Sequence, residues 1–252
     1  MYLRPETQAA HDAFWALTRD ALRDHGNLAP KTLSHDAPIH ATWARSDLFL
    51  GQICNLPYNL HFRKTVVRIG TSDYALPEAG PGQYYSVFVV REDDPRTAPA
   101  DFADATLAIN ESGSHSGWGA PWGYAQDAGF SWTCVQETGA HAQSAAHIAT
   151  GHADIAAIDA VSWRMIQRYD ACAKHLRVIG RTKASPGQTL ITAATNDPIP
   201  IRAALNQALT ALPEPQAETL LLCGLVTLDD ADYDQIARPF PPPTPRNAAK
   251  LG

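Results

Sequence analysis

Residues 110–117 read Asn-Glu-Ser-Gly-Ser-His-Ser-Gly and lie between two segments of regular structure. The apolar run 106–109 before them predicts a buried strand, and residues 116–128 after them predict a helix. The first N–H groups of a helix lack intrahelical acceptors, and the helix dipole favours negative charge there. Ser114 and Ser116 add hydroxyl donors, and His115 is a third candidate donor. The stretch therefore predicts an anion-binding turn.

The segments around this turn alternate between strand and helix. Helices of about ten residues between short strands predict a sheet with parallel strands and helices on its faces. We assign this series to a second lobe, residues 91–182. Its predicted strands are 106–109, 132–136, 154–158 and 176–181, and its predicted helices are 116–128, 141–150 and 160–169.

The rest of the chain predicts a first lobe that is discontinuous in sequence, residues 1–90 plus 183–236. Its predicted elements are helix 7–25, strands 65–70, 84–90 and 189–194, a loop at 55–58, and helices 198–212 and 215–223. Residues 237–252 form a proline-rich tail that we expect to be extended or disordered. Two crossings between the lobes imply an α/β fold with a hinged cleft, and ligands of such folds bind beyond the carboxyl ends of the strands.

A second stretch extends the pattern. It opens with Gly139-Ala140-His141 and continues from Gly151-His152-Ala153-Asp154 to Asp159. Together with Ser114-His115-Ser116-Gly117 it resembles the solute-binding proteins of phosphonate, phosphite and phosphate uptake, over about residues 47–198. The resemblance implies a two-lobed, type 2 periplasmic-binding-protein fold with mixed, mostly parallel sheets flanked by helices. It also implies a small oxyanion ligand and an ABC permease as partner.

The candidate ligand-binding residues follow from both arguments. In the second lobe they are Ser114, Ser116, His115, His141 and Asp159; a serine could instead only cap the helix, and a carboxylate at the end of an apolar strand needs a partner. In the first lobe they are Asn55, Tyr58, Tyr74 and Tyr2. The resemblance implies a first strand with a ligand-contacting loop, which is shortened or missing here, so either the start is misplaced or Tyr2 does the work of that loop. Asp154 is expected to pair structurally, and Trp118, Trp122 and Trp132 to lie in the core.

The composition excludes several classes of function. A net charge of −6 leaves no basic surface for nucleic acid. No apolar window is long enough for a transmembrane helix. The N-terminal residues lack a basic region followed by an apolar run, which predicts a cytoplasmic location, or a periplasmic one if the start is truncated or misannotated. Four scattered cysteines predict free thiols, and the histidine spacings predict no metal site. We expect no cofactor.

Binding without catalysis is the expected function, as part of an uptake system or as a cytosolic sensor. One alternative is a cytosolic enzyme with His141 or His115 as base and Asp159 as its partner. Another is an interaction module that presents the proline-rich tail to a partner.

Overall fold

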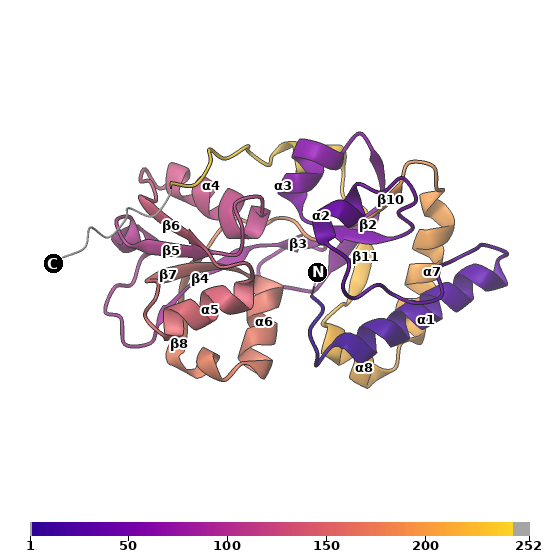
Figure 1. Ribbon diagram of the computed structural model, residues 1–252, viewed down its shortest axis with the longest axis horizontal. Helices are drawn as coiled ribbons and strands as arrows, with labels where there is room; N and C mark the ends of the chain where they lie inside the picture. Colours follow the sequence, from indigo (N-terminus) through magenta and orange to yellow (C-terminus); the bar gives the residue numbers. More distant parts are fainter. Residues whose placement is uncertain (1, 244–252) are drawn as a thin grey trace. The chain divides into compact units, whose positions relative to one another are not determined.

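The computed structural model describes residues 2–243 (Figure 1) and divides them into two compact units. Unit 1 consists of residues 2–84 and 185–235, and unit 2 of residues 85–184 and 236–243. Each unit has its own sheet and its own core. In the described part of the chain no helix is long and apolar enough to cross a membrane.

Unit 2 contains a five-stranded sheet in the order β6-β5-β7-β4-β8. Its strands are β4 (Ser86–Arg91), β5 (Thr106–Ile109), β6 (Cys134–Glu137), β7 (Ile155–Asp159) and β8 (Leu176–Arg181). Strand β5 runs parallel to β6 and β7, whereas β4 is antiparallel to β7 and β8. The parallel strands β5, β6 and β7 therefore end at one edge of the sheet.

Helices cover both faces of this sheet. They are α4 (Ala120–Asp127), α5 (His141–Ala149) and α6 (Ala160–Tyr169), with short turns at Pro99–Phe102, His115–Gly119 and Ala171–His175. Figure 1 shows α4 on one side of the sheet and α5 with α6 on the other. Alternate strand residues point to opposite faces, so Phe88 and Val90 pack with Trp118 and Trp132 on the α4 side. Both tryptophans are core residues, as predicted, and Trp122 packs against them.

Unit 1 contains a four-stranded sheet in the order β1-β10-β2-β11. Its strands are β1 (Gly51–Ile53), β2 (Val66–Asp73), β10 (Thr189–Ala193) and β11 (Gly224–Val226), and a separate pair joins β3 (Gln83–Tyr84) to β9 (Ser185–Pro186). Every pairing in the four-stranded sheet is antiparallel, although mostly parallel sheets were predicted. Two of these pairings involve β10, which returns from unit 2 and runs between β1 and β2 in the opposite direction to both, and the third joins β11 to β2.

The helices of unit 1 are α1 (Gln8–Asp24), α2 (Ile39–Trp43), α3 (Asn55–Pro57), α7 (Pro198–Ala211), α8 (Glu214–Leu220) and α9 (Asp230–Asp234). Helices α1 and α7 are far apart in sequence but lie side by side, and Leu22 and Leu205 pack with Ile69 of the sheet. On the other face α9 inserts Tyr233, which is fully buried. Its hydroxyl lies 2.7 Å from Thr71 Oγ1 and 2.8 Å from Thr189 Oγ1.

Three boundaries differ from the sequence prediction. The first crossing lies at residues 84–85 and not at 91, because β4 pairs with β7 and β8 in the sheet of unit 2. Residues 55–58 are helical and not a loop, because a proline in a first helical turn removes only an N–H that has no partner there. Residues 236–243 belong to unit 2, where Trp118 Nε1 donates to the carbonyl of Phe240 over 2.7 Å. Residues 244–252 of the predicted tail lie outside the described residues.

Candidate functional site

The loop after β5 forms the predicted turn at the carboxyl edge of the unit 2 sheet. It leads into a π-helical turn, His115–Gly119, that continues directly into α4. Ser114 caps this turn, because its Oγ accepts a hydrogen bond from the N–H of Gly117 over 3.1 Å. The carbonyl of Ser114 also accepts from the N–H groups of Trp118 and Gly119. The helix N-terminus is therefore formed as the sequence predicts, with Ser114 as its cap.

Gly117 is required by the packing of this turn. A Cβ atom at this position would lie 2.0 Å from Oδ1 of Asn110 and 3.4 Å from its backbone nitrogen. The Asn110 side chain is therefore packed against the bare backbone of Gly117. The Ser-x-Ser-Gly order is explained by sterics as well as by hydrogen bonding.

Ser116 connects the turn to His141, the first residue of α5. Its Oγ lies 3.2 Å from Ser114 Oγ and 3.0 Å from His141 Nε2. Ser114 and Ser116 are each 2% exposed. The strands β5 and β6 are parallel neighbours, so the loops that follow them carry these three side chains to the same edge of the sheet. The structure thus brings together three of the predicted residues.

Asp159, the last residue of β7, lies at the same edge. Its Oδ1 accepts a hydrogen bond from Ser162 N over 2.8 Å and so caps α6. Burial lowers the pKa of His141, and the negative charge of Asp159 opposes this shift. His141 is therefore neutral near pH 7, with a carboxylate close enough to influence its titration.

His115 is also part of the turn, but its ring is buried. It is 6% exposed, and this burial lowers its pKa to about 4. The ring is therefore neutral at physiological pH. A neutral imidazole can still donate one hydrogen bond, but it brings no positive charge to an anion.

Two contributors were missed by the sequence analysis. The Oγ of Ser86 donates to the carbonyl of Ser116 over 2.7 Å, which fixes the turn to β4. The sequence contained an indication of this contact, because Ser86 is a polar residue within an apolar strand and needs a hydrogen-bond partner when buried. Asn110 is the second, and nothing in its sequence context indicates that it packs on Gly117.

The four candidates from the first lobe all lie in unit 1 and are all buried. Tyr2 and Tyr74 contact each other, with ring centroids 5.1 Å apart. Asn55 Nδ2 donates to the carbonyl of Pro186, while its Oδ1 has no hydrogen-bond partner in the described part of the chain. Tyr58 packs in the core beside Tyr233, with ring centroids 5.4 Å apart. The roles of these four residues in ligand binding stay a prediction.

Asp154 has a structural role, as predicted. Its Oδ2 accepts from the N–H of Thr106 over 2.8 Å, and its Oδ1 lies 3.7 Å from Arg96 Nη2. The four cysteines are free thiols, of which Cys54 is buried and Cys223 is exposed.

Comparison with known families identifies the chain. A family model described as "ABC transporter, phosphonate, periplasmic substrate-binding protein" matches residues 53–234. The chain belongs to this family. The match includes every candidate site residue except Tyr2. The family consists of substrate-binding proteins and not of enzymes, and it is named as periplasmic. No curated protein matches the chain.

Solved structures show the same fold at low sequence identity. PhnD1 from Prochlorococcus marinus, in complex with methylphosphonate, has a TM-score of 0.70 and 15% identity, with 91% of each chain covered. XAC2383 from Xanthomonas citri, bound to ATP, has a TM-score of 0.68 and 16% identity, again with 91% of each chain covered. A phosphonate-transporter binding protein, PA3383 from Pseudomonas aeruginosa, has a TM-score of 0.61 and 14% identity, with 88% and 78% covered. These likenesses confirm the predicted type 2 periplasmic-binding-protein fold.

Proposed function

We propose that the protein binds a small tetrahedral oxyanion, phosphonate-like or phosphate-like, at the edge of the unit 2 sheet. The observation that carries the proposal is the position of Ser116 Oγ, 3.2 Å from Ser114 Oγ and 3.0 Å from His141 Nε2 in the first turn of a helix. Hydroxyl donors and backbone N–H groups there meet the oxygens of an anion, and the helix dipole favours its charge.

His141 orients the donor. When its Nε2 carries the proton, it donates to Ser116 Oγ, so the hydroxyl proton of Ser116 is directed to the ligand. A charge-assisted hydrogen bond of this kind contributes about 1.5–3 kcal/mol. The carboxylate of Asp159 favours an oxyanion that keeps one proton, because it can accept that proton and would repel a doubly charged anion.

The protein would act as the solute-binding component of an ABC uptake system, with a permease as partner. Family membership supports this role, and so does the ligand named for the Prochlorococcus neighbour. The candidate ligands are therefore methylphosphonate and related alkylphosphonates, phosphite and phosphate. A sensor that uses the same anion site is the alternative role.

The proposal is tested by calorimetric titration of the purified protein with methylphosphonate, phosphite, phosphate and sulfate. We expect one of the protonatable anions to bind and sulfate not to bind. Ser116→Ala should weaken binding about tenfold to 100-fold, because one charge-assisted donor is lost. Ser131→Ala, at an exposed serine of the same unit, is the matched control and should bind like the unmodified protein. If all four anions fail to bind, or if Ser116→Ala binds normally, the proposal is wrong.

The Ser116–His141 contact also favours a second candidate, hydrolysis by a serine nucleophile with a histidine base. Family membership argues against it, and Asp159 Oδ1 is engaged as a helix cap. The two functions differ in the fate of the ligand. Phosphorus NMR of methylphosphonate or a phosphate monoester, incubated with the protein for hours, should show the compound unchanged if the protein is a binder.

A further inference from the structure

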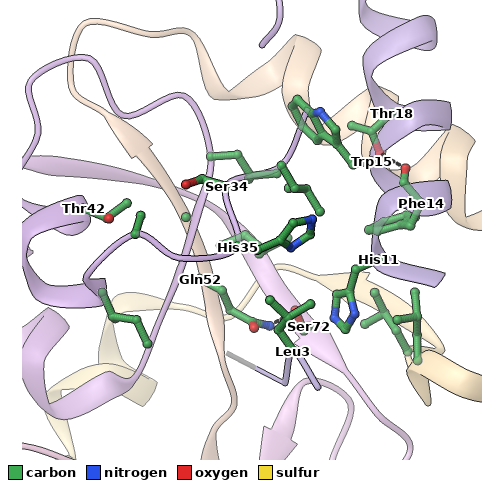
Figure 2. A pocket seen from close by; sticks show the side chains of 18 of the residues that line it. Leu3, His11, Phe14, Trp15, Thr18, Ser34, His35, Thr42, Gln52 and Ser72 are labelled. Carbon is green, nitrogen blue, oxygen red and sulfur yellow. Dashed lines mark hydrogen bonds between the residues drawn. The ribbon is translucent and has the colours of Figure 1, made fainter. Parts of the chain in front are cut away.

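Unit 1 contains a cavity of about 530 Å³ whose lining differs in chemistry from the anion turn (Figure 2). It lies between α1, the segment 33–43 and the sheet residues Leu50–Gln52 and Leu190. Much of its wall is apolar and comes from Leu3, Phe14, Trp15, Leu50, Leu205 and Leu220. None of the residues of the anion turn lines it.

The cavity opens to solvent, because Ser34, Asp36 and Ile39 in its wall are exposed. Sites for small molecules measure about 300–1,000 Å³ and combine apolar walls with a few polar groups. The cavity falls within this range and has that composition.

The polar groups converge from three elements, as Figure 2 shows for His11, His35 and Gln52. The Nδ1 of His11 lies 2.9 Å from the carbonyl of Thr7, which can only accept. The proton is therefore on Nδ1, and Nε2 of the neutral ring is an acceptor. Burial lowers the pKa of His11, which keeps the ring neutral.

His35 also lines the cavity and contacts α1. Its Nε2 lies 2.9 Å from Asp12 Oδ1, so Nε2 carries a proton. Gln52 Nε2 donates to Ser72 Oγ and to the Tyr74 hydroxyl, each over 3.2 Å. His11 Nε2 therefore offers an acceptor to whatever fills the cavity.

The charged residues of the lining favour the same kind of ligand. Asp36 lines the cavity, and no lysine or arginine is among the described residues that line it. An anion would lie near the Asp36 carboxylate, and no lysine or arginine of the described lining would balance its charge. A hydroxyl or ammonium group would find acceptors, and aromatic faces of Trp15 and Trp43 suit its apolar body.

We propose that this cavity is a second ligand site, which binds a small, largely apolar molecule with a hydroxyl or amine head group. Its chemistry is opposite to that of the anion turn. The site does not depend on the proposed anion function, and either could exist without the other.

The test compares three probes with the same aromatic body, 3-phenylpropanol, 3-phenylpropylamine and 3-phenylpropanoate. Calorimetric titration of the full chain should show binding of the alcohol or the amine and at least tenfold weaker binding of the carboxylate. The comparison of alcohol with amine tells which head group is preferred. Equal binding of the carboxylate would overturn the ligand class, and binding of none of the probes at millimolar concentration would overturn the site.

Three variants locate the binding. Ala37→Trp places an indole in the cavity from a loop position that is only half buried, so the fold should persist, and it should abolish probe binding. Ala79→Trp, at a half-buried alanine elsewhere in unit 1 that does not line the cavity, is the matched control and should bind normally. His11→Phe keeps a ring but removes an acceptor, and should weaken alcohol binding about three- to tenfold. Normal probe binding by Ala37→Trp, with circular dichroism unchanged, would show that the probes bind elsewhere and refute the proposal.

Discussion

The anion turn of unit 2 and the cavity of unit 1 differ in how their polar groups are satisfied. At the turn, the hydroxyls of Ser86, Ser114 and Ser116 all have partners within 3.2 Å, and the side chains are almost fully buried. In the cavity, apolar side chains leave a volume of about 530 Å³, and His11 offers an acceptor. The turn is preorganised by hydrogen bonds that a ligand can replace, whereas the cavity is shaped by packing that a ligand can complete. Substitutions that remove hydrogen bonds should therefore affect the turn. Substitutions that change side-chain volume should affect the cavity.

Acidification should act most strongly on the turn. The pKa of His115 is about 4 in the folded protein, against 6.5 for an unperturbed histidine. The unfolded chain therefore binds a proton between these values that the folded chain excludes. The His115 ring therefore leaves the free energy of unfolding unchanged above pH 6.5. Below that pH it lowers this free energy, by about 3 kcal/mol as the pH drops towards 4.

Urea unfolding at pH 7 and pH 4.5 measures this loss. His115→Gln, which does not titrate, should remove much of it. His11→Gln is the comparison in unit 1, where burial also lowers the histidine pKa and acts in the same direction. A pH dependence that persists in full in His115→Gln would show that the turn is not the acid-sensitive region.

Gly117→Ala tests whether sterics shape the turn. The added Cβ would meet Asn110 Oδ1 at 2.0 Å, so the Asn110 side chain has to move. We expect a loss of about 2 kcal/mol in the free energy of unfolding and weaker anion binding. The double variant Gly117→Ala with Asn110→Ala removes the obstructing amide and should recover part of both. Probe binding in the cavity should not change in either variant. A change in probe binding would show that the turn and the cavity are not independent.

Tyr233→Phe tests the core of unit 1 without altering its volume. The hydroxyl lies within 2.8 Å of both Thr71 and Thr189 and is fully buried. Its removal leaves the two threonines short of a partner, so we expect a loss of about 1–2 kcal/mol by urea denaturation. Tyr124→Phe is the matched control, since that hydroxyl forms no hydrogen bond in the described part of the chain. An equal loss of stability in both variants would show that the hydrogen bonds of the Tyr233 hydroxyl do not stabilise unit 1.

Asp159→Asn should have the smallest effect on stability. Asparagine keeps an oxygen that can cap α6 through Ser162 N, so we expect a loss below about 1 kcal/mol. The charge that opposes the lowering of the His141 pKa is lost, so this pKa should fall further. NMR titration of the His141 ring, assigned with His141→Gln, measures the shift, and an unchanged or higher pKa would exclude electrostatic coupling between the two residues.

The sequence predicted unit 2 better than unit 1. Strands and helices from Thr106 to Arg181 could be located because each has its own hydrophobic pattern, and their order fixed which loops meet. Ser116 and His141 were placed together for this reason. Pattern alone could not show that β4 pairs in unit 2, since an apolar strand fits either sheet equally well.

The remaining features depend on three-dimensional packing. The contact of Asn110 with Gly117 and the bonds of Tyr233 to two distant threonines join residues whose own sequence context is ordinary. The cavity has no local signal either, because Trp15, Leu50 and Leu205 each lie in a segment that predicts normal core packing.

The position of β10 between β1 and β2 also fixes an order of events during synthesis. Residues 85–184 of unit 2 are contiguous, so its sheet can form as soon as they have left the ribosome. In unit 1, β1 and β2 both pair with a strand that is translated more than one hundred residues later. Strands β1 and β2 must therefore wait for β10 while unit 2, which is encoded after them, folds. During that interval their apolar residues are exposed to aggregation or to chaperones.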